Sequence, residues 1–443
     1  MKHIAFHTLG CKLNFSETAT LARECQEKGY ALVDFGTRAD IVVLNTCSVT
    51  ERADRECRQL VRRAKRTSPD ALIVVTGCYA QLQPETIAAI PGVNLVLGTR
   101  EKAELLDHLN SRASHERRVN VSNISEATEI MNAASTGFAD RTRSFLKIQD
   151  GCDYNCSFCT IPLARGRSRS IPAGLLEQEA RSIVEQGFRE IVLTGVNVGD
   201  YGKSSGSSLL DLLNVLTRID GLERLRVSSI EPNLLTDELL EFWLSHDVMC
   251  PHFHIPLQSG SDPILKSMRR RYQREWYANR LQRIKEMVPD AGIGSDVIVG
   301  FPGETNSHFE ETYRFLVDMP VSYLHVFTYS ERPNTAALSI EGSVEMRERA
   351  RRSERLRMLS VRKRQLFHKR FVGKNVSVLL EGKGADGVTT GLTREYVRVN
   401  IPGEYKAGAI EEVLIERTGD GVCWGVPLNA SSESQIVRNE VAA

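Results

Sequence analysis

Short apolar runs alternate with amphipathic stretches in the first hundred residues. The runs lie at residues 4–6, 41–44, 72–75 and 95–97, with polar or amphipathic stretches at 16–29 and 52–67 between them. This alternation predicts a small parallel sheet with helical crossovers. We expect this domain to span residues 1–112. A Ser-, Asn- and Ala-rich linker is expected at 113–137.

A second alternating series begins after the expected linker. Strand-like runs at 145–149, 191–194, 225–229, 253–256, 293–299 and 323–329 enclose helix-like stretches at 173–186, 209–219, 237–245, 275–288 and 308–318. Six βα units predict a partial (βα)6 barrel over residues 138–371, with functional loops at the carboxyl ends of its strands. Short β segments with Gly-rich turns predict a small β-barrel over 372–437. The expected fold class is therefore α/β with a terminal β-barrel.

Composition says little about the specific function, but it bears on the cellular compartment and on the role of the cysteines. The 443 residues are 41% hydrophobic and 26% charged with a net charge of +1, so any nucleic-acid surface must be local. We expect a cytoplasmic protein with no membrane partner, because no signal-peptide pattern or membrane-spanning apolar run is present. Ten cysteines in a reducing compartment are unsuited to a disulfide framework. The cysteines expected to be ordinary core or surface residues are Cys25, Cys57, Cys250 and Cys423.

Three cysteines stand close together in GCDYNCSFCTIP, just after a predicted strand. Cys152, Cys156 and Cys159 have C-x3-C-x2-C spacing, which lets three thiolates surround one metal centre. A structural zinc site normally needs a fourth protein ligand, whereas three cysteines on a four-iron cluster leave one iron open. A zinc knuckle or unliganded thiols are the alternatives. The spacing, Phe158 and the six βα units resemble the radical S-adenosylmethionine (SAM) superfamily.

That resemblance implies a [4Fe–4S] cluster on these cysteines, with SAM bound at the open iron and cleaved to a 5′-deoxyadenosyl radical. It also implies cofactor contacts from segments at the ends of successive strands, LTGVNVGDY, SSIEP, HIPLQSGSD and DVIVGFPGET. Taken singly, each Gly-rich turn after a strand is more often only a turn. The residues expected to bind the cofactor are Phe158, Gly195, Asn197, Ser229, Glu231, Gln258, Asp296 and Gly300.

A second set of three cysteines is spread along the first domain. Cys11, Cys47 and Cys78 each follow a predicted strand, beside Gly or Thr and beyond the apolar run. The carboxyl ends of parallel strands share one edge of a sheet, so we expect these thiols to converge. The alternative is that they are ordinary buried cysteines. As ligands of a second cluster they would leave one iron for an exogenous group such as sulfide or methylthiolate.

The order of these parts resembles the radical SAM methylthiotransferases over nearly the whole chain. The resemblance implies an auxiliary [4Fe–4S] cluster on Cys11, Cys47 and Cys78, where one SAM methylates a sulfur that a second, radical-forming SAM helps to transfer. The opening TLGCKLNFSET, with Lys12, Leu13 and Asn14 after the first cysteine, resembles the branch that modifies C2 of N6-threonylcarbamoyladenosine at position 37 of tRNA. Isopentenyladenosine-37 and the aspartate of ribosomal protein S12 are alternative substrates. A non-catalytic iron–sulfur RNA-binding or redox protein is the alternative of another class.

RNA contacts are expected at the terminal barrel, in a basic run at 347–370, at 161–170 directly after the central cysteines, and at 327–335. The terminal barrel resembles the TRAM domain, an RNA-binding module, and a basic run at 347–370 is either a solvated helix face or part of the RNA surface. The expected partners are a tRNA anticodon stem-loop and an electron donor such as flavodoxin or ferredoxin, with the sulfur donor left open. The residues expected to contact RNA are Arg165, Arg167, Arg169, Arg332, Lys374, Arg394, Tyr396 and Arg398.

Overall fold

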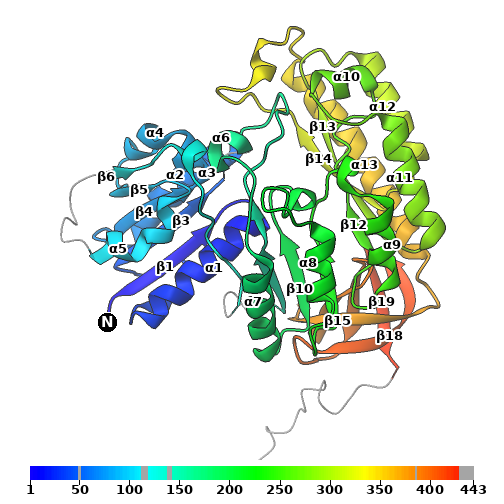
Figure 1. The fold of residues 1–443 in the computed structure, drawn as a ribbon, viewed down its shortest axis with the longest axis horizontal. Coiled ribbons are helices and arrows are strands. Elements are labelled where there is room, and N and C mark those ends of the chain that lie inside the picture. The colour runs from blue at the N-terminus through cyan, green and yellow to red at the C-terminus, as the bar shows by residue number, and fades with distance from the viewer. Residues whose placement is uncertain (48–50, 111–117, 137–141, 385–386, 429–443) are drawn as a thin grey trace, which may run out of the picture.

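The computed structural model describes residues 1–47, 51–110, 118–136, 142–384 and 387–428 (Figure 1). The N-terminal sheet is parallel, with strand order β2-β1-β3-β4-β5-β6. Its strands are β1 (His3–Thr8), β2 (Ala31–Val33), β3 (Ile41–Thr46), β4 (Leu72–Gly77), β5 (Leu95–Leu97) and β6 (Arg118–Asn120). Its helices are α1 (Lys12–Glu27), α2 (Glu51–Thr67), α3 (Cys78–Leu82), α4 (Pro84–Ala88) and α5 (Leu105–Asn110).

Helices cover both faces of this sheet. The apolar side of α1 packs on one face, and α2 packs on the other, so the central strands are buried on both sides and contain almost only apolar residues. The four predicted strands are all present. The two edge strands, β2 and β6, were not predicted; β6 is a polar three-residue strand inside the expected linker and pairs with β5. Part of that segment therefore completes the sheet.

The central part is an open arc of six parallel strands, here called the half-barrel (Figure 1). Two three-stranded sheets, β11-β10-β7 and β12-β13-β14, are joined by a bridge between Ser229 and His254. This arrangement confirms the predicted partial (βα)6 barrel. The strands are β7 (Arg143–Lys147), β10 (Glu190–Thr194), β11 (Arg224–Val227), β12 (His252–His254), β13 (Gly292–Val299) and β14 (Tyr323–Thr328), and a hairpin of β8 (Gln149–Asp150) and β9 (Arg169–Ser170) follows β7.

Helices cover the outer face of the half-barrel and enclose the largest apolar core. They are α7 (Ala173–Glu185), α8 (Leu209–Leu216), α9 (Asp237–Ser245), α10 (Asp262–Ser267), α11 (Arg274–Met287), α12 (Asn306–Asp318) and α13 (Met346–Lys369), whereas α6 (Ile161–Arg165) packs against α3 of the first domain. The basic helix α13 is partly structural, because buried Arg349 pairs with Glu331 and buried Arg352 pairs with Glu304. No helix in the described residues combines the length and apolar character needed to cross a membrane.

The terminal domain is a closed five-stranded barrel with order β15-β16-β17-β19-β18, as predicted. Its strands are β15 (Asn375–Lys383), β16 (Val388–Thr393), β17 (Arg398–Pro402), β18 (Ile410–Gly419) and β19 (Val422–Pro427). The barrel sits below the amino ends of the half-barrel strands, next to the end of α13 (Figure 1).

A turn of this terminal barrel closes the lower end of the half-barrel. Arg226 of β11 donates to the carbonyl oxygen of Arg394 (3.0 Å), and the ring of Tyr396 stacks on His252, with 4.4 Å between ring centroids. Tyr396 has a left-handed φ of 72°, a conformation that directs the chain into this tight turn. The two domains therefore share a polar interface inside the half-barrel.

Candidate functional site

Cys152, Cys156 and Cys159, the central cysteine group, lie on a loop between β8 and α6 at the carboxyl end of the half-barrel. The loop begins at Gly151, which has a φ of 74°; a Cβ there would lie 1.9 Å from the carbonyl oxygen of Arg167, so only glycine fits. The three thiols are free, as a cluster-binding group requires. The loop geometry therefore brings together the three cysteines predicted from their spacing.

Each thiol of this group accepts a hydrogen bond. The backbone amides of Tyr154 and Ile161 donate to Cys152 and Cys159 (3.4 and 3.5 Å), and Arg270 donates to Cys156 (3.1 Å). Burial is the main cause, and the neighbouring thiols a lesser one, that raises the pKa of Cys152 to about 11 and that of Cys159 to about 12. Each thiol raises the pKa of another only because the three sulfurs are near neighbours. Thiolates that accept such bonds fit the donor set of an iron–sulfur cluster.

Cys11, Cys47 and Cys78, the N-terminal cysteine group, lie at one edge of the first sheet. Cys11 precedes α1, Cys47 follows β3, and Cys78 begins α3 directly after β4. A Cβ added to Gly10 would lie 2.9 Å from the Cys47 sulfur, and Cys11 contributes to the raised pKa of the Cys78 thiol, after burial. The predicted convergence is thus present in the geometry, and cluster ligation by these cysteines stays a prediction.

Two asparagines hold the loops of the N-terminal group together. Asn14 donates to the carbonyl oxygens of Leu9 (2.9 Å) and Thr46 (3.0 Å), which precede Cys11 and Cys47. Asn45 donates in return to the carbonyl oxygen of Asn14 (3.0 Å). Sequence reasoning missed both roles, because an asparagine after a strand is normally interpreted as a turn residue.

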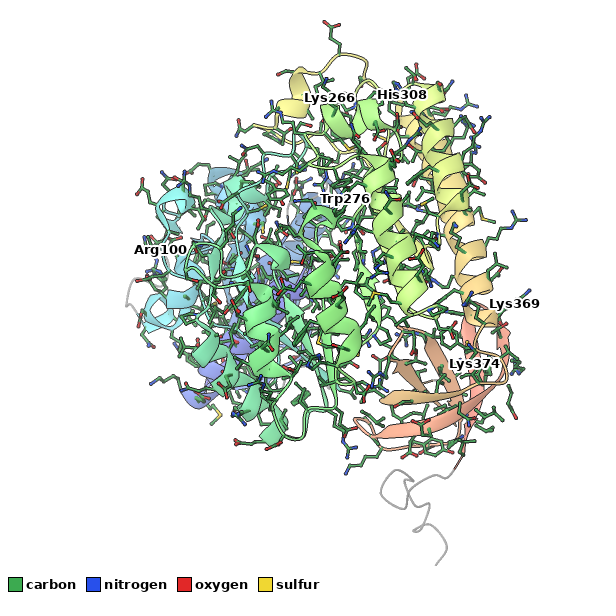
Figure 2. The ribbon with its side chains drawn as sticks, turned by 45° about the vertical axis from the view of Figure 1, so that its right-hand side comes forward. Arg100, Lys266, Trp276, His308, Lys369 and Lys374 are labelled. Carbon is green, nitrogen blue, oxygen red and sulfur yellow. The ribbon has the colours of Figure 1, made fainter. Side chains whose placement is uncertain are left out.

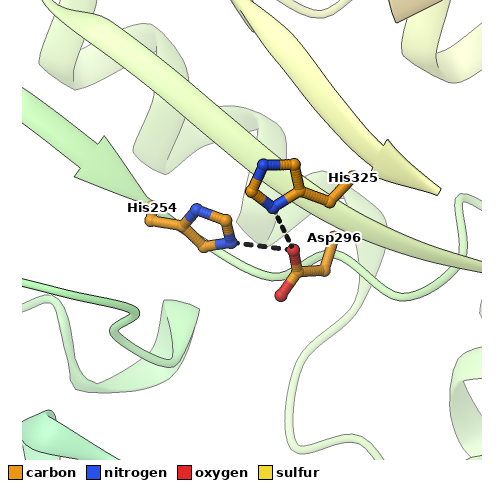
Figure 3. A group of neighbouring side chains, drawn as sticks. All are labelled: His254, Asp296 and His325. Atoms are coloured by element: carbon orange, nitrogen blue, oxygen red, sulfur yellow. Dashed lines mark hydrogen bonds and ion pairs between the residues drawn. The ribbon is translucent and has the colours of Figure 1, made fainter. Parts of the chain in front are cut away.

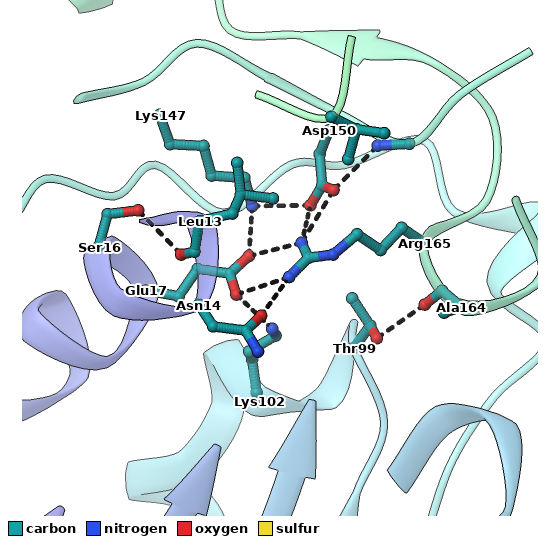
Figure 4. A network of polar contacts seen from close by, with 12 residues as sticks. Leu13, Asn14, Ser16, Glu17, Thr99, Lys102, Lys147, Asp150, Ala164 and Arg165 are labelled. Carbon is teal, nitrogen blue, oxygen red and sulfur yellow. Dashed lines mark hydrogen bonds and ion pairs between the residues drawn. The ribbon is translucent and has the colours of Figure 1, made fainter. Parts of the chain in front are cut away.

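A buried group of charges lies between the two cysteine groups (Figure 4). Glu17 of α1 stands one helical turn after Asn14, and Arg165 of α6 follows the central group. We call Glu17, Lys102, Lys147, Asp150 and Arg165 the interdomain ion network. Its contacts are Lys102–Glu17 (2.5 Å), Lys147–Glu17 (2.7 Å), Lys147–Asp150 (2.7 Å), Arg165–Asp150 (2.9 Å), Arg165–Glu17 (3.0 Å) and Arg165–Asn14 (2.6 Å).

The prediction that Arg165 contacts RNA is wrong. Its side chain is 1% exposed and its guanidinium is surrounded by Glu17 and Asp150. Arg332 is also buried, in an ion pair with Asp54 (2.7 Å), so it too is unavailable to a phosphate. Arginine beside a functional loop indicates charge but not whether that charge faces water.

The loop after β10 supplies two of the predicted cofactor residues. Gly195 lies against Gln149, whose side-chain oxygen accepts from the amides of Val196 and Asn197 (both 2.9 Å). None of the described residues hydrogen-bonds the buried side-chain oxygens of Asn197 or Ser228. Unpaired buried oxygens are costly unless a ligand satisfies them. These atoms fit the polar amino-acid end of SAM.

Glu231 is linked to the central group through Arg270. Its carboxylate forms an ion pair with Arg270, which also donates to Cys156 and packs over the ring of Tyr272. Glu231 therefore lies near the central cysteine group, and the side chain of Arg270 links its carboxylate to Cys156. Arg270 was not predicted, because nothing distinguishes it in the sequence from the arginines on either side of it.

A cavity of about 300 Å³ opens beside Cys159, and we call it the first cavity. Phe158, Gln258, Asp296 and Ile298 also line it. Three predicted cofactor residues thus share one cavity with a cysteine. Ser229 takes part in the bridge that joins the two sheets of the half-barrel. Gly300 lies elsewhere: its amide donates to Glu304, and a Cβ there would lie 2.3 Å from the Arg349 side chain. Its role is to allow α13 to approach.

The remaining residues predicted to contact RNA divide into two groups. Arg394 and Tyr396 form the turn that closes the half-barrel, and Arg169 donates to the carbonyl oxygens of Arg165 (2.6 Å) and Ala127 (3.3 Å). All three have intramolecular roles. Arg167, Arg398 and Lys374 are exposed, although Arg398 and Lys374 also pair with Glu381 and Asp290. Lys374 lies beside Lys369 where α13 meets the terminal barrel (Figure 2).

Family models match two of these parts. Residues 3–98 match the Uncharacterized protein family UPF0004, and residues 146–316 match the Radical SAM superfamily. Among solved structures, the radical S-adenosylmethionine methyltransferase TsrM from Kitasatospora setae resembles the fold, with a TM-score of 0.57 over 76% of this chain and 77% of that chain, at 14% identity.

Curated relatives extend over the full length. The chain is 40% identical to threonylcarbamoyladenosine tRNA methylthiotransferase MtaB of Bacillus subtilis, over 100% of this chain and 98% of that protein. It therefore belongs to the radical SAM methylthiotransferase family. It is 39% identical to MtaB of Aquifex aeolicus (93% and 100% covered). It is 34% identical to tRNA-2-methylthio-N(6)-dimethylallyladenosine synthase of Syntrophotalea carbinolica (87% and 90% covered).

Proposed function

We propose that this enzyme adds a methylthio group to C2 of N6-threonylcarbamoyladenosine at position 37 of tRNA, beside the anticodon. The observation that carries the proposal is that two groups of three cysteines flank one buried ion network, with a cavity open beside Cys159. Methylthio transfer needs a radical source and a sulfur source that face the same substrate. Similarity to the MtaB proteins along the whole chain supports this adenosine as the substrate.

The residues of the chain have distinct roles in this proposal. The central cysteine group holds the [4Fe–4S] cluster that, when bound, supplies the electron for cleaving SAM to a 5′-deoxyadenosyl radical. Asn197 and Ser228 offer unpaired oxygens to the polar end of SAM, and Phe158 and Ile298 give the cavity apolar walls for a flat base. The N-terminal cysteine group holds the auxiliary [4Fe–4S] cluster.

The proposed partners follow from the proposed substrate. A tRNA anticodon stem-loop approaches the half-barrel rim, where Arg167 is exposed. An electron donor such as flavodoxin or ferredoxin supplies the central cluster, and we place the reaction in the cytoplasm, together with the tRNA.

Deleting the gene and analysing tRNA nucleosides by mass spectrometry tests the substrate. We expect 2-methylthio-N6-threonylcarbamoyladenosine to disappear and the unmodified form to accumulate, with recovery after complementation. Loss of the methylthio mark from isopentenyladenosine instead, or from ribosomal protein S12, would identify one of the alternative substrates. An unchanged nucleoside profile would refute the assignment to threonylcarbamoyladenosine.

Cysteine variants of the reconstituted enzyme test the division of labour. Cys11→Ala is expected to keep 5′-deoxyadenosine formation and lose methylthio transfer, whereas Cys156→Ala loses both. Cys25→Ala is the control, because Cys25 is buried in an apolar core near the carboxyl end of α1, and this variant is expected to keep both activities. Full product formation by Cys11→Ala would exclude the auxiliary-cluster role.

A further inference from the structure

Two histidines and an aspartate meet inside the half-barrel (Figure 3). His254 Nε2 lies 2.8 Å from Asp296 Oδ1, and His325 Nδ1 lies 3.3 Å from the same oxygen. The residues come from β12, β13 and β14, three neighbouring strands, and Asp296 and His325 are directly paired in register. The roles proposed above for cluster and SAM binding use neither histidine.

This group separates two cavities. Asp296 lines the first cavity, which it shares with Cys159. His325 lines a second cavity of about 190 Å³, together with Arg364 and Arg398. The His325 side chain is 49% exposed, against 12% for His254, so His325 is the member most open to a ligand. A ligand that reaches past the first cavity would meet this imidazole.

The surroundings of the group carry positive charge. Burial alone would raise the pKa of Tyr396, but Lys12, Arg143 and Arg226 lower it. Glu190 pairs with Arg226 and is a buried carboxylate at this end of the half-barrel. The cations near the group outnumber the acids Glu190 and Asp296, which favours an anionic ligand over a neutral one.

The hydrogen-bond pattern leaves one donor available. Asp296 contacts one ring nitrogen of each imidazole and so fixes the orientation of both rings. None of the described residues hydrogen-bonds Nε2 of His325. An imidazole held at Nδ1 by a carboxylate presents Nε2–H to a second acceptor.

We infer that His325 is a specificity-determining residue that receives the carboxylate of the threonylcarbamoyl side chain, with Asp296 and His254 as positioning residues. This inference rests on the proposed function and deepens it. The threonylcarbamoyl group carries an anion, and the isopentenyl group is apolar. A carboxylate gains a hydrogen bond from His325, whereas an apolar group would displace water from this donor without pairing it.

The test uses the reconstituted full-length enzyme and two anticodon stem-loop RNAs, one with N6-threonylcarbamoyladenosine and one with its methyl ester. We expect the wild type to prefer the carboxylate by about 10- to 100-fold in kcat/KM, through KM. His325→Ala is expected to lose the preference, with KM for the ester unchanged, and His325→Lys to recover part of it. Iron content and 5′-deoxyadenosine formation without RNA, which do not require His325, check folding.

His308→Gln is the matched control, because this histidine caps α12 and lines neither cavity. It is expected to keep the wild-type preference. A preference retained by His325→Ala would overturn the inference. Stoichiometric zinc bound by wild type, lost in His325→Ala and required for product formation would also overturn it, in favour of a metal site. If the wild type converts only isopentenyladenosine RNA, the proposed function fails first, and that result is distinct from both.

Discussion

Replacing Glu17 by Gln should destabilise the contact between the two cysteine-bearing domains. Glu17 has no exposed surface, and its carboxylate faces Lys102, Lys147 and Arg165. The substitution keeps the shape of the side chain but removes its charge. Lys147 and Arg165 then keep only Asp150 as a carboxylate partner in this network, and Lys102 loses its ion pair. Removing one partner from a buried ion group costs roughly 3–5 kcal/mol. That is a large fraction of the ~5–15 kcal/mol that stabilises a typical domain.

Because a chain with several domains need not unfold in one step, the assay should report on the interface itself. Hydrogen exchange followed by mass spectrometry would compare α1 and α6 in the variant and the wild type, with guanidinium unfolding alongside. Glu27→Gln, an exposed position on the same helix, is the control and should change stability by less than about 0.5 kcal/mol. Adding Lys102→Met to Glu17→Gln should recover part of the loss, since it removes a stranded charge.

The same residue gives a pH dependence. Burial alone would raise the pKa of Glu17, but Arg165, Lys102 and Lys147 hold it well below its usual range. A carboxylate with a lowered pKa in the folded state stabilises the protein above its unfolded pKa of about 4.3. That stability is lost as the pH falls through the folded value. The wild type should therefore lose more stability than Glu17→Gln below about pH 4. Equal exchange rates in Glu17→Gln and Glu27→Gln at neutral pH would refute the reasoning.

Three further predictions concern other parts of the molecule. Gly10→Ala should push Cys47 aside and halve the iron content, while 5′-deoxyadenosine still forms. Gly29→Ala is the control, because Gly29 also has a positive φ but has open space around it, and iron analysis should show both clusters. Arg226→Met should speed hydrogen exchange in the turn at Tyr396 by weakening domain docking, and unchanged exchange would contradict the shared interface. Arg167→Ala should weaken tRNA binding and lower its salt slope by about 1, whereas Arg283→Ala on the outer face of α11 should change neither.

Local pattern was sufficient for the central strands of the first sheet, for the strands of the half-barrel and for both cysteine groups. A strand end is visible in the sequence as the end of an apolar run, and parallel strands then bring Cys11, Cys47 and Cys78 to one edge. The neighbours of Arg165 could not be found in this way, because its partner Glu17 is 148 residues away in the chain. A basic side chain is normally exposed, and only the three-dimensional structure shows that carboxylates surround this one.

Contacts between distant parts of the chain were also missed in the terminal domain. Its closed barrel followed from short β segments and Gly-rich turns, but the insertion of Tyr396 beneath the half-barrel had no local signal. The surface residues predicted for RNA therefore included side chains that hold domains together. His325 was missed because a single histidine in an apolar strand carries no periodic pattern.

The turn at Tyr396 limits how the terminal barrel can be exchanged between relatives. Arg224 and Arg226 donate to carbonyl oxygens of that barrel, at Leu392 and Arg394, so a chimera with a foreign barrel must reproduce the same turn. A version of the chain truncated before β15 would expose two buried guanidinium groups and the lower opening of the half-barrel to water. Grafting experiments that aim to change RNA preference should therefore keep residues 392–397 and exchange only the parts of the barrel that do not contact the half-barrel.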